Sequence, residues 1–304
     1  MAVTFKKAKR GLSKLRLALS GVSGSGKTYS ALLLAKGLGG RIAVIDTERG
    51  SASLYADMPG IPEFDVLELE APFSPERYVE AIRAAEDAGY DVLIIDSMTH
   101  EWTGKGGCLE LVEEIAKARF RGNTWSAWSE LTPRHRDFVD AILTSKLHVI
   151  ATMRSKTETA QEEKNGRKIV QKLGMKTEQR DGTDYEFTVM FDITHDGHFA
   201  VPSKDRTGLF MSEKNPFVIS EETGKRIKGW LESSGVTPEQ FADLMARTLE
   251  ADSLDVLAQI GKEIASFGLC NEDRDKIKEA YKTRRAELMR EASNEKEEGN
   301  GQCE

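Results

Sequence analysis

The sequence predicts an α/β protein: a mostly parallel sheet with helices on both faces, an antiparallel extension and a small helical region after it. Three observations predict this class. Short, uniformly apolar runs alternate with helical patterns between residues 15 and 153, as expected for parallel strands buried on both faces. From about residue 220 onward the pattern is helical only. A glycine-rich segment also separates the first apolar run from the first helix.

Five apolar runs are expected to form the parallel strands. They cover residues 15–20, 41–46, 64–69, 91–96 and 147–153. Right-handed crossovers between such strands place all their C-terminal ends at one edge of the sheet, which is where α/β proteins bind ligands. Residues that directly follow these runs are therefore the first candidates for a functional site.

Helices are expected over residues 28–37, 75–88 and 132–145. In the second helix Ser74 can act as the N-cap before a proline in the first turn, and Thr132 can do the same in the third. Residues 185–193 and 198–202 follow without an intervening helix, so we expect an antiparallel hairpin that turns at Asp196 and Gly197.

Composition excludes several classes. The chain has 304 residues, of which 39% are hydrophobic and 31% charged, which suits a globular protein and not a collagen-like or disulfide scaffold. No run approaches the roughly 18–20 apolar residues that span a bilayer, so no membrane partner is expected. Three cysteines far apart, and a basic N-terminus without the apolar core of a signal peptide, favour a reduced, cytoplasmic protein.

Charge and pattern divide the chain into four expected parts. They are a basic N-terminal arm (1–14), an α/β core (15–220), a helical region (221–292) and a disordered acidic tail (293–304). The net charge is −7, and residues from 220 onward hold 13 basic and 19 acidic side chains. Because nearly all of the excess acid lies there, the acidic total does not exclude a nucleic-acid partner for the core. The tail could compete with DNA for a basic segment.

The strongest chemical signal lies between the first expected strand and helix. It fits the motif G-x-x-x-x-G-K-[ST] and comprises Gly21, Val22, Ser23, Gly24, Ser25, Gly26, Lys27 and Thr28. The glycines let backbone N–H groups bind phosphate oxygens, and the helix start adds its positive dipole end. Lys27 then reaches the β- and γ-phosphates, and the Thr28 hydroxyl binds Mg²⁺.

A dinucleotide site is the rival interpretation of this loop, because Asp46 ends the second strand about 20 residues downstream. The glycine spacing here is G-x-x-G-x-G, however, whereas the dinucleotide fingerprint is G-x-G-x-x-G. A lysine and a threonine directly after the last glycine also favour a nucleoside triphosphate.

Two carboxylates follow neighbouring strands of the predicted sheet. Asp96 closes the run DVLIID, where a carboxylate beside the phosphate loop would hold Mg²⁺. Glu48 lies just past the second strand, where it could face the γ-phosphate and orient or deprotonate a water molecule.

The order of these motifs (the phosphate loop, then V-I-D-T-E, then L-I-I-D-S) resembles the RecA-type recombinase ATPases. The resemblance implies that Glu48 is the hydrolytic base and that Asp96 is the aspartate of the family's D-S pair. The family's γ-phosphate sensor, usually glutamine, falls at Thr152, and Arg154 is a second candidate. Residues 203–208 resemble the motif whose two basic residues, here Lys204 and Arg206, reach into the ATP site of a neighbouring subunit.

Residues 15–212 look closest to phage-encoded RecA-like AAA ATPases of the single-strand annealing and recombination type. Segments such as D-S-M-T-H-E-W, L-T-P-R-H and K-D-R-T-G-L-F carry that likeness. It implies ATP and Mg²⁺ as cofactors, single-stranded DNA as a partner, a homo-oligomeric ring or filament, and a bacterial host cytoplasm as the location. The alternatives are a nucleotide-gated loader or adaptor that recruits a recombination or replication partner through its C-terminal helices, and a small-molecule kinase.

Residues 156–180 are expected to form a long polar loop, at the position of the mobile DNA-binding loop in RecA-like proteins. The basic residues expected to contact phosphates are Lys164, Arg167, Lys168, Lys172 and Lys176. Since the loop has no aromatic residue, base stacking would come from elsewhere, and Trp102, Trp125 or Trp128 are candidates if they are not core residues. His195 and His198 flank the expected Asp-Gly turn, and a hairpin tip is favoured over a metal site.

Overall fold

The computed structural model describes residues 13–164, 167–210, 216–232, 238–266 and 271–299. The chain divides into two compact units, one of residues Lys14–Lys225 and one of Arg226–Glu304 together with Met1–Ser13. Residues 1–12, which make up most of the expected basic arm, lie outside the described residues. None of the helices in the described part of the chain combines the length and the apolar character that a membrane-spanning segment requires.

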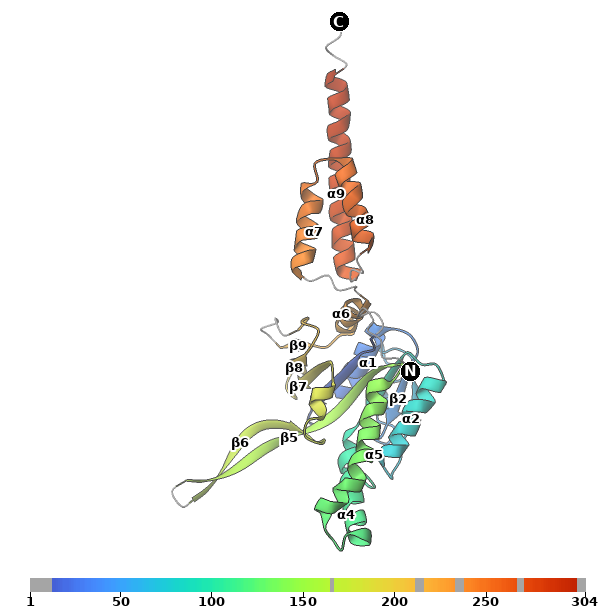
Figure 1. Cartoon of the computed structure of the whole chain (residues 1–304), viewed down its shortest axis with the longest axis vertical. Helices are drawn as coiled ribbons and strands as arrows, with labels where there is room; N and C mark the ends of the chain where they lie inside the picture. The colour runs from blue at the N-terminus through green and yellow to red at the C-terminus, as the bar shows by residue number, and fades with distance from the viewer. Residues whose placement is uncertain (1–12, 165–166, 211–215, 233–237, 267–270, 300–304) are drawn as a thin grey trace, which may run out of the picture. The chain divides into compact units, whose positions relative to one another are not determined.

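Six strands form the parallel part of the sheet in the Lys14–Lys225 unit (Figure 1). They are β1 (Arg16–Gly21), β2 (Ile42–Asp46), β3 (Asp65–Glu68), β4 (Val92–Asp96), β5 (His148–Lys164) and β7 (Val189–Ile193). Their order across the sheet is β3-β2-β4-β5-β1-β7. In this register Asp46 lies opposite Asp96, and Leu19 lies opposite Thr152. The C-terminal ends of β1, β2, β4 and the parallel part of β5 therefore meet at one edge.

Two further strands extend the sheet in antiparallel fashion. Strand β8 (Phe199–Asp205) pairs with β7, and the short β9 (Phe217–Val218) pairs with β8. The expected hairpin exists, but its first strand begins at Val189 because residues Thr183–Glu186 form a short 3₁₀ turn. Together with the helices on its faces, this sheet confirms the predicted α/β class.

Helices cover both faces of the sheet because successive strand side chains point to opposite faces. On one face, α2 (Pro75–Asp87) and α5 (Thr124–Thr144) bury side chains such as Tyr78 and Phe138 against alternate strand residues. On the other face lies α1 (Lys27–Leu38), which contacts β1, β4 and β5. The first helix thus starts at the sheet edge where the strands end.

The helical segment before β5 is longer than expected. Helix α5 begins at Thr124, with the Asn123 side chain accepting a hydrogen bond from the Ser126 N–H at 3.2 Å, so Thr132 is not its cap. Pro133 lies inside the helix, at a cost of about 3 kcal/mol. Packing on both sides of the proline offsets this cost, since Leu131 packs against α4 (Cys108–Arg119) and Phe138 packs in the main core.

The prediction of a long polar loop is wrong, because residues 156–180 form mostly a β-hairpin. Strand β5 continues to Lys164 and pairs with β6 (Arg167–Thr177), from Ser155 opposite Thr177 to Lys164 opposite Arg167. Figure 1 shows the two strands extending together beyond the sheet. Threonines on β5 and the pair Ile169 and Val170 on β6 supply the β-propensity that the charge of the segment conceals.

The C-terminal part of the chain is helical, as expected. Helix α6 (Glu221–Glu232) is followed by α7 (Pro238–Glu250), α8 (Leu254–Ser266) and α9 (Asn271–Gly299). The last three pack around a small core that contains Leu244, Leu257, Ile260, Ile277 and Leu288. Helix α9 runs to Gly299, so residues 293–299 are helical where a disordered tail was expected; residues 300–304 lie outside the described residues.

Candidate nucleotide-binding site

The phosphate-loop motif lies in the predicted context, between β1 and α1. Gly24 and Gly26 have φ angles of 78° and 87°, which favour glycine, so the loop can turn its backbone inward. The Lys27 ammonium donates to the Val22 carbonyl at 2.9 Å. Burial lowers the pKa of Lys27, while Asp96 and Glu48 oppose that shift. The buried Ser25 hydroxyl has no hydrogen-bond partner in the described residues, which leaves one donor inside the loop available to a ligand.

Asp96, at the end of β4, connects the phosphate loop to β5. Its Oδ2 accepts a hydrogen bond from the Thr28 hydroxyl at 2.6 Å, and its Oδ1 accepts one from the Thr152 hydroxyl at 2.5 Å. Burial raises the pKa of this carboxyl, against the effect of the two hydroxyls. A buried carboxylate beside a hydroxyl is the oxygen donor set that Mg²⁺ prefers, so the residues present fit the ion.

Glu48 lies beyond β2 and is held by an ion pair. Its Oε1 accepts hydrogen bonds from Nη2 and Nε of Arg154 at 2.7 and 3.0 Å, and both side chains are partly exposed. Asp46 shapes the loop, since its carboxylate accepts the N–H groups of Glu48 and Ala52 at 2.6 and 2.8 Å. Both Asp46 oxygens thus accept backbone N–H groups and the residue is buried, which argues against the ribose contact that the dinucleotide interpretation requires.

His100 was not among the expected site residues, yet it contacts the loop after β2. Its Nδ1 lies 2.7 Å from the hydroxyl of Thr47, which also accepts the Ser97 N–H at 2.8 Å. Burial and the nearby Arg154 charge lower the pKa of His100, which favours the neutral imidazole. The only signal in the sequence that His100 could belong to the site was its position four residues after Asp96.

The turn between β7 and β8 also reaches the phosphate loop. The Nδ1 of His198 lies 3.0 Å from the Ser25 carbonyl oxygen, and a Cβ added at Gly26 would lie 3.4 Å from the same nitrogen. A Cβ at Gly24 would lie 3.6 Å from the Nε2 of His195. The hairpin tip is therefore a wall of the candidate site, which neither interpretation of the two histidines anticipated.

Lys204 and Arg206 lie together near the end of β8. Both donate to the Tyr185 carbonyl, Arg206 at 2.9 Å, and Lys204 also donates to the Asp184 carbonyl at 3.1 Å. Burial and the Arg206 charge lower the pKa of Lys204. None of these hydrogen bonds reaches the phosphate loop of the same chain.

The five basic residues expected to contact DNA lie on the β5–β6 hairpin. Lys164 ends β5, while Arg167, Lys168, Lys172 and Lys176 are on β6. Of these, only the side chain of Lys176 is among the described ones, and its ammonium pairs with Asp181 at 2.8 Å. The backbone places all five on one projecting element.

A second buried polar cluster lies between α3 (Thr99–Thr103), α4 and α5. The Oε1 of Glu101 accepts a hydrogen bond from the Cys108 thiol at 2.9 Å and lies 2.9 Å from Nδ1 of His135. Burial and the Glu101 charge raise the pKa of Cys108. Since each group has a partner, the cluster is satisfied without a further ligand.

These features define a P-loop nucleotide-binding core: a phosphate loop between a strand and a helix, with a buried carboxylate against its threonine. Residues 13–227 match the AAA_24 family, described as an AAA domain, and the chain belongs to that family. A solved structure titled as the RadB recombinase is similar at 16% identity over 64% of this chain and 83% of that one, with a TM-score of 0.38. No curated protein matches the chain.

Proposed function

We propose that this protein is a RecA-like ATPase, encoded by a phage and acting on single-stranded DNA in recombination, annealing or replication in the host cytoplasm. The observation that carries the nucleotide part is the 2.6 Å hydrogen bond between Thr28 and Asp96, because it joins a hydroxyl and a carboxylate at the lysine of the phosphate loop. Membership of the AAA-domain family supports the same conclusion.

We assign the binding of ATP to the backbone of the phosphate loop and to a few of its side chains. The backbone N–H groups of residues 21–28 and the Ser25 hydroxyl bind phosphate oxygens, and Lys27 exchanges its bond to the Val22 carbonyl for a bond to phosphate. Thr28 and Asp96 would hold Mg²⁺, which when bound neutralises charge on the β- and γ-phosphates. Thr152, whose hydroxyl donates to the other Asp96 oxygen, is the proposed sensor of the γ-phosphate.

Glu48 is the residue proposed to orient and deprotonate the attacking water molecule. Its ion pair with Arg154 fixes the carboxylate through Oε1, and neither hydrogen bond from the arginine uses Oε2. The backbone of Arg154 is fixed in turn because its N–H donates to the hydroxyl of Thr99, three residues after Asp96, at 2.9 Å. Arg154 thus links Glu48 to α3, the helix that follows the strand carrying Asp96.

Lys204 and Arg206 are proposed to act on the ATP of a neighbouring copy, in a homo-oligomeric ring or filament. Their hydrogen bonds go to the backbone carbonyls of Asp184 and Tyr185, and the Lys204 ammonium also lies 5.7 Å from the Tyr185 ring centroid. Exchange of those weak neutral acceptors for phosphate would be favourable, because hydrogen bonds between charged groups are the stronger ones.

The β5–β6 hairpin is proposed to contact single-stranded DNA. It projects from the strand that carries Thr152 and Arg154, so it is covalently continuous with the nucleotide site (Figure 1). Because its contacts would be mainly to phosphates, binding should weaken steeply as salt rises.

The test compares ATP binding, ATP hydrolysis and oligonucleotide binding in the purified full chain. The proposal expects magnesium-dependent ATP binding that is lost in Lys27→Ala, and binding of an oligothymidylate at low salt that depends on nucleotide. Retention of full ATP hydrolysis in Lys27→Ala would contradict the nucleotide part, and failure to bind the oligonucleotide in any nucleotide state would contradict the DNA part.

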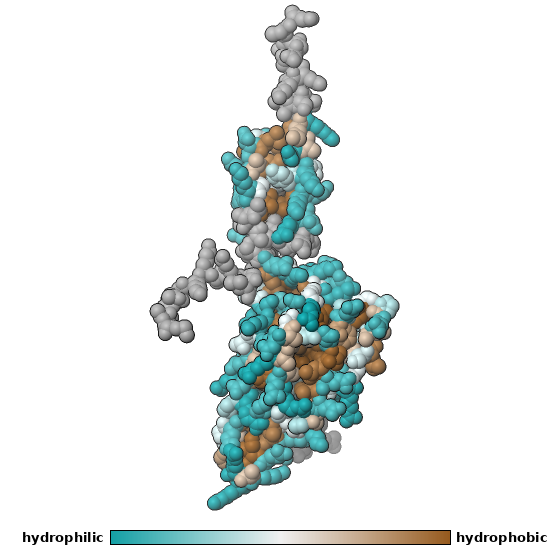
Figure 2. Space-filling model, turned by 90° about the vertical axis from the view of Figure 1, so that its right-hand side faces the viewer, coloured by the Kyte–Doolittle hydropathy of each residue, from teal (hydrophilic) through white to brown (hydrophobic). Residues whose placement is uncertain are grey.

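A nucleotide-gated loader or adaptor is the second candidate, and one observation favours it. The three-helix unit exposes the apolar side chains Leu249, Leu254 and Val256 at 52%, 39% and 40% of their surface, and Figure 2 shows brown hydrophobic areas on both units. Deletion of residues 235–304 separates the candidates. DNA annealing survives the deletion if the chain acts on DNA itself, whereas recruitment of a partner protein vanishes if it is an adaptor.

A further inference from the structure

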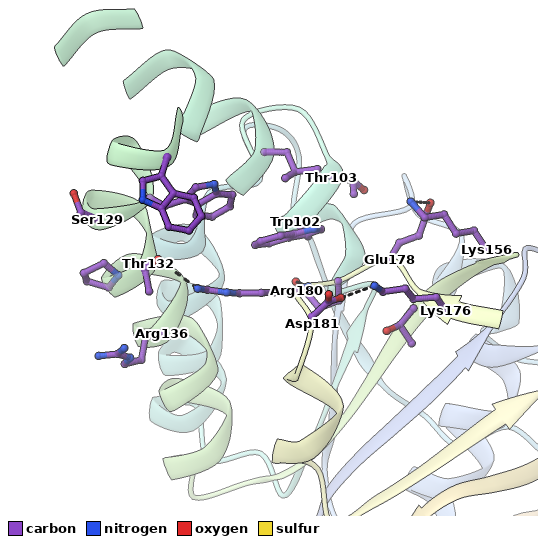
Figure 3. Close-up of a pocket in the computed structure, with 16 residues that line it drawn as sticks. Trp102, Thr103, Ser129, Thr132, Arg136, Lys156, Lys176, Glu178, Arg180 and Asp181 are labelled. Atoms are coloured by element: carbon purple, nitrogen blue, oxygen red, sulfur yellow. Dashed lines mark hydrogen bonds and ion pairs between the residues drawn. The ribbon is translucent and has the colours of Figure 1, made fainter. Parts of the chain in front are cut away.

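A large cavity lies in the Lys14–Lys225 unit between α3, α5 and the base of the β5–β6 hairpin (Figure 3). Its volume is about 1160 Å³, which is ample for a nucleotide. Trp102, Trp125 and Trp128 line one wall, and residues Lys176–Asp181 with Lys156 line the opposite one. The cavity therefore combines aromatic and cationic side chains.

All three tryptophans line this space, and two of them stack on each other. Trp102 and Trp128 stack with ring centroids 5.4 Å apart and an interplanar angle of 25°. Trp125 lies one helical turn from Trp128 on α5, and 87% of its surface is exposed. An exposed indole beside a stacked pair is an unfilled stacking surface, because burial of an aromatic ring is strongly favourable.

Cationic groups lie beside these rings. Figure 3 shows Arg180 extending across the cavity, and its guanidinium lies 5.7 Å from the Trp128 ring centroid and 3.5 Å from the Thr132 hydroxyl. Arg136, on α5, is exposed and also lines the cavity. Lys156 and Lys176 pair with Glu178 and Asp181 at 3.6 and 2.8 Å. The two arginines are thus the groups best placed to bind an anion next to a flat ring.

We propose that this cavity binds a base of single-stranded nucleic acid by stacking, with the adjoining phosphates at Arg136 and Arg180. The inference rests on the proposed function and identifies the base-binding site within it. A flat ring joined to an anion is the ligand that matches stacked indoles beside guanidinium groups. An aromatic side chain from a second copy would fill the space but would not use the arginines.

Both walls of the cavity are connected to the candidate nucleotide-binding site by short stretches of chain and by hydrogen bonds. Trp102 lies on α3, which starts three residues after Asp96, and Lys156 lies two residues after Arg154 on β5. The buried Gln179 side chain ties the opposite wall to α3, since its Nε2 donates to the Met98 carbonyl at 3.1 Å and to Glu101 at 3.4 Å. Changes at Asp96 or Glu48 on nucleotide binding therefore reach both walls.

The test measures fluorescence anisotropy of two labelled strands of equal length, an oligothymidylate and an abasic strand, with the full chain, Mg²⁺ and a slowly hydrolysed ATP analogue. Trp125→Ala is the main variant, because its exposed side chain makes it unimportant for folding, and Trp125→Phe keeps a ring face. The wild type should bind the thymidylate about 5- to 150-fold tighter than the abasic strand. Trp125→Ala should lose most of that preference, and Trp125→Phe should retain it.

Three other outcomes overturn the inference in distinguishable ways. If the wild type binds neither strand, the proposed DNA function fails and the cavity with it. If Trp125→Ala keeps the wild-type preference, DNA binding stands and the cavity is not the base site. If the DNA-free Trp125→Ala protein sediments as a smaller species than the wild type, the cavity is an interface between copies.

Discussion

The hydroxyl of Thr28, on α1, donates to the carboxylate of Asp96, at the end of β4, over 2.6 Å and across 68 positions of sequence. Strand β5 lies between β1 and β4 in the sheet, so the contact depends on the shared edge where these parallel strands end. It brings the two proposed magnesium ligands together at the lysine of the phosphate loop.

Replacement of the Thr28 hydroxyl tests this contact. Thr28→Val keeps the shape of the side chain and removes the oxygen, so affinity for magnesium with ATP should fall about 10- to 100-fold, the usual effect of disturbing a metal site. Isothermal titration with an ATP analogue at several Mg²⁺ concentrations measures it. Thr28→Ser, which keeps the hydroxyl, is the matched control; equal loss in both variants would point to packing instead of metal binding.

Glu48→Gln should separate hydrolysis from binding. Loss of a general base typically costs about 10²- to 10⁴-fold in rate, so turnover should fall by that amount while the dissociation constant for ATP stays within about twofold. Phosphate release under single-turnover conditions measures the rate. Glu63→Gln, at an exposed position outside the site, provides the control. If Glu48→Gln hydrolyses ATP at the wild-type rate, Glu48 is not the general base.

The proposed action of Arg206 across subunits is tested by mixing. Lys27→Ala and Arg206→Ala should each lack ATPase activity alone, the first through its own site and the second through its neighbour's. Mixed in equal amounts, they should recover part of the wild-type rate, since some junctions combine an intact loop with an intact arginine. No recovery in assemblies shown to contain both variants would mean that Arg206 acts within its own chain or not at all.

The ion pair between α2 and α5 makes stability depend on pH. Arg134 lowers the pKa of Glu76 from 4.5 to about 2, chiefly through hydrogen bonds to its side chain. The stabilisation is therefore complete above about pH 4.5 and lost as pH falls toward 2. Because both side chains are partly exposed, we expect Glu76→Gln to lower the free energy of unfolding at pH 7 by only about 1 kcal/mol.

Urea denaturation of the two proteins between pH 7 and pH 3 measures this difference. The gap between wild type and Glu76→Gln should narrow as pH falls. Glu113→Gln is the control, since Glu113 pairs with Lys117 at 3.8 Å on an exposed helix face and should contribute less than 0.5 kcal/mol. If the difference in unfolding free energy between the two proteins stays constant across this range, the effect of Glu76 does not come from its charge.

The parallel core was predictable because its signals are local. Uniform apolar runs identified the strands, and since parallel strands end at a common edge, the position of Asp96 after one run and of Thr28 after another implied that the two would be near each other. The phosphate loop could be recognised by its glycines, and the same glycines allow it to form because glycine adopts positive φ angles freely.

The features that the sequence did not predict depend on tertiary contacts. Pro133 suggested a helix start, yet packing on both sides carries α5 through it. The charge of residues 156–180 suggested a loop, although cross-strand pairing makes a hairpin. His198 is 173 positions from Ser25, and only the pairing of β7 with β1 and β8 brings the turn to the phosphate loop. No local pattern encodes such a contact.

The central claim is that ATP at the Lys27 loop controls binding of single-stranded DNA. The most direct measurement is anisotropy of a labelled oligothymidylate at low salt, with Mg²⁺, with and without a slowly hydrolysed ATP analogue, for the wild type and Lys27→Ala. The account predicts tight binding by the wild type only with the analogue, and weak binding by Lys27→Ala in both conditions. Equal binding by the wild type with and without the analogue would contradict it.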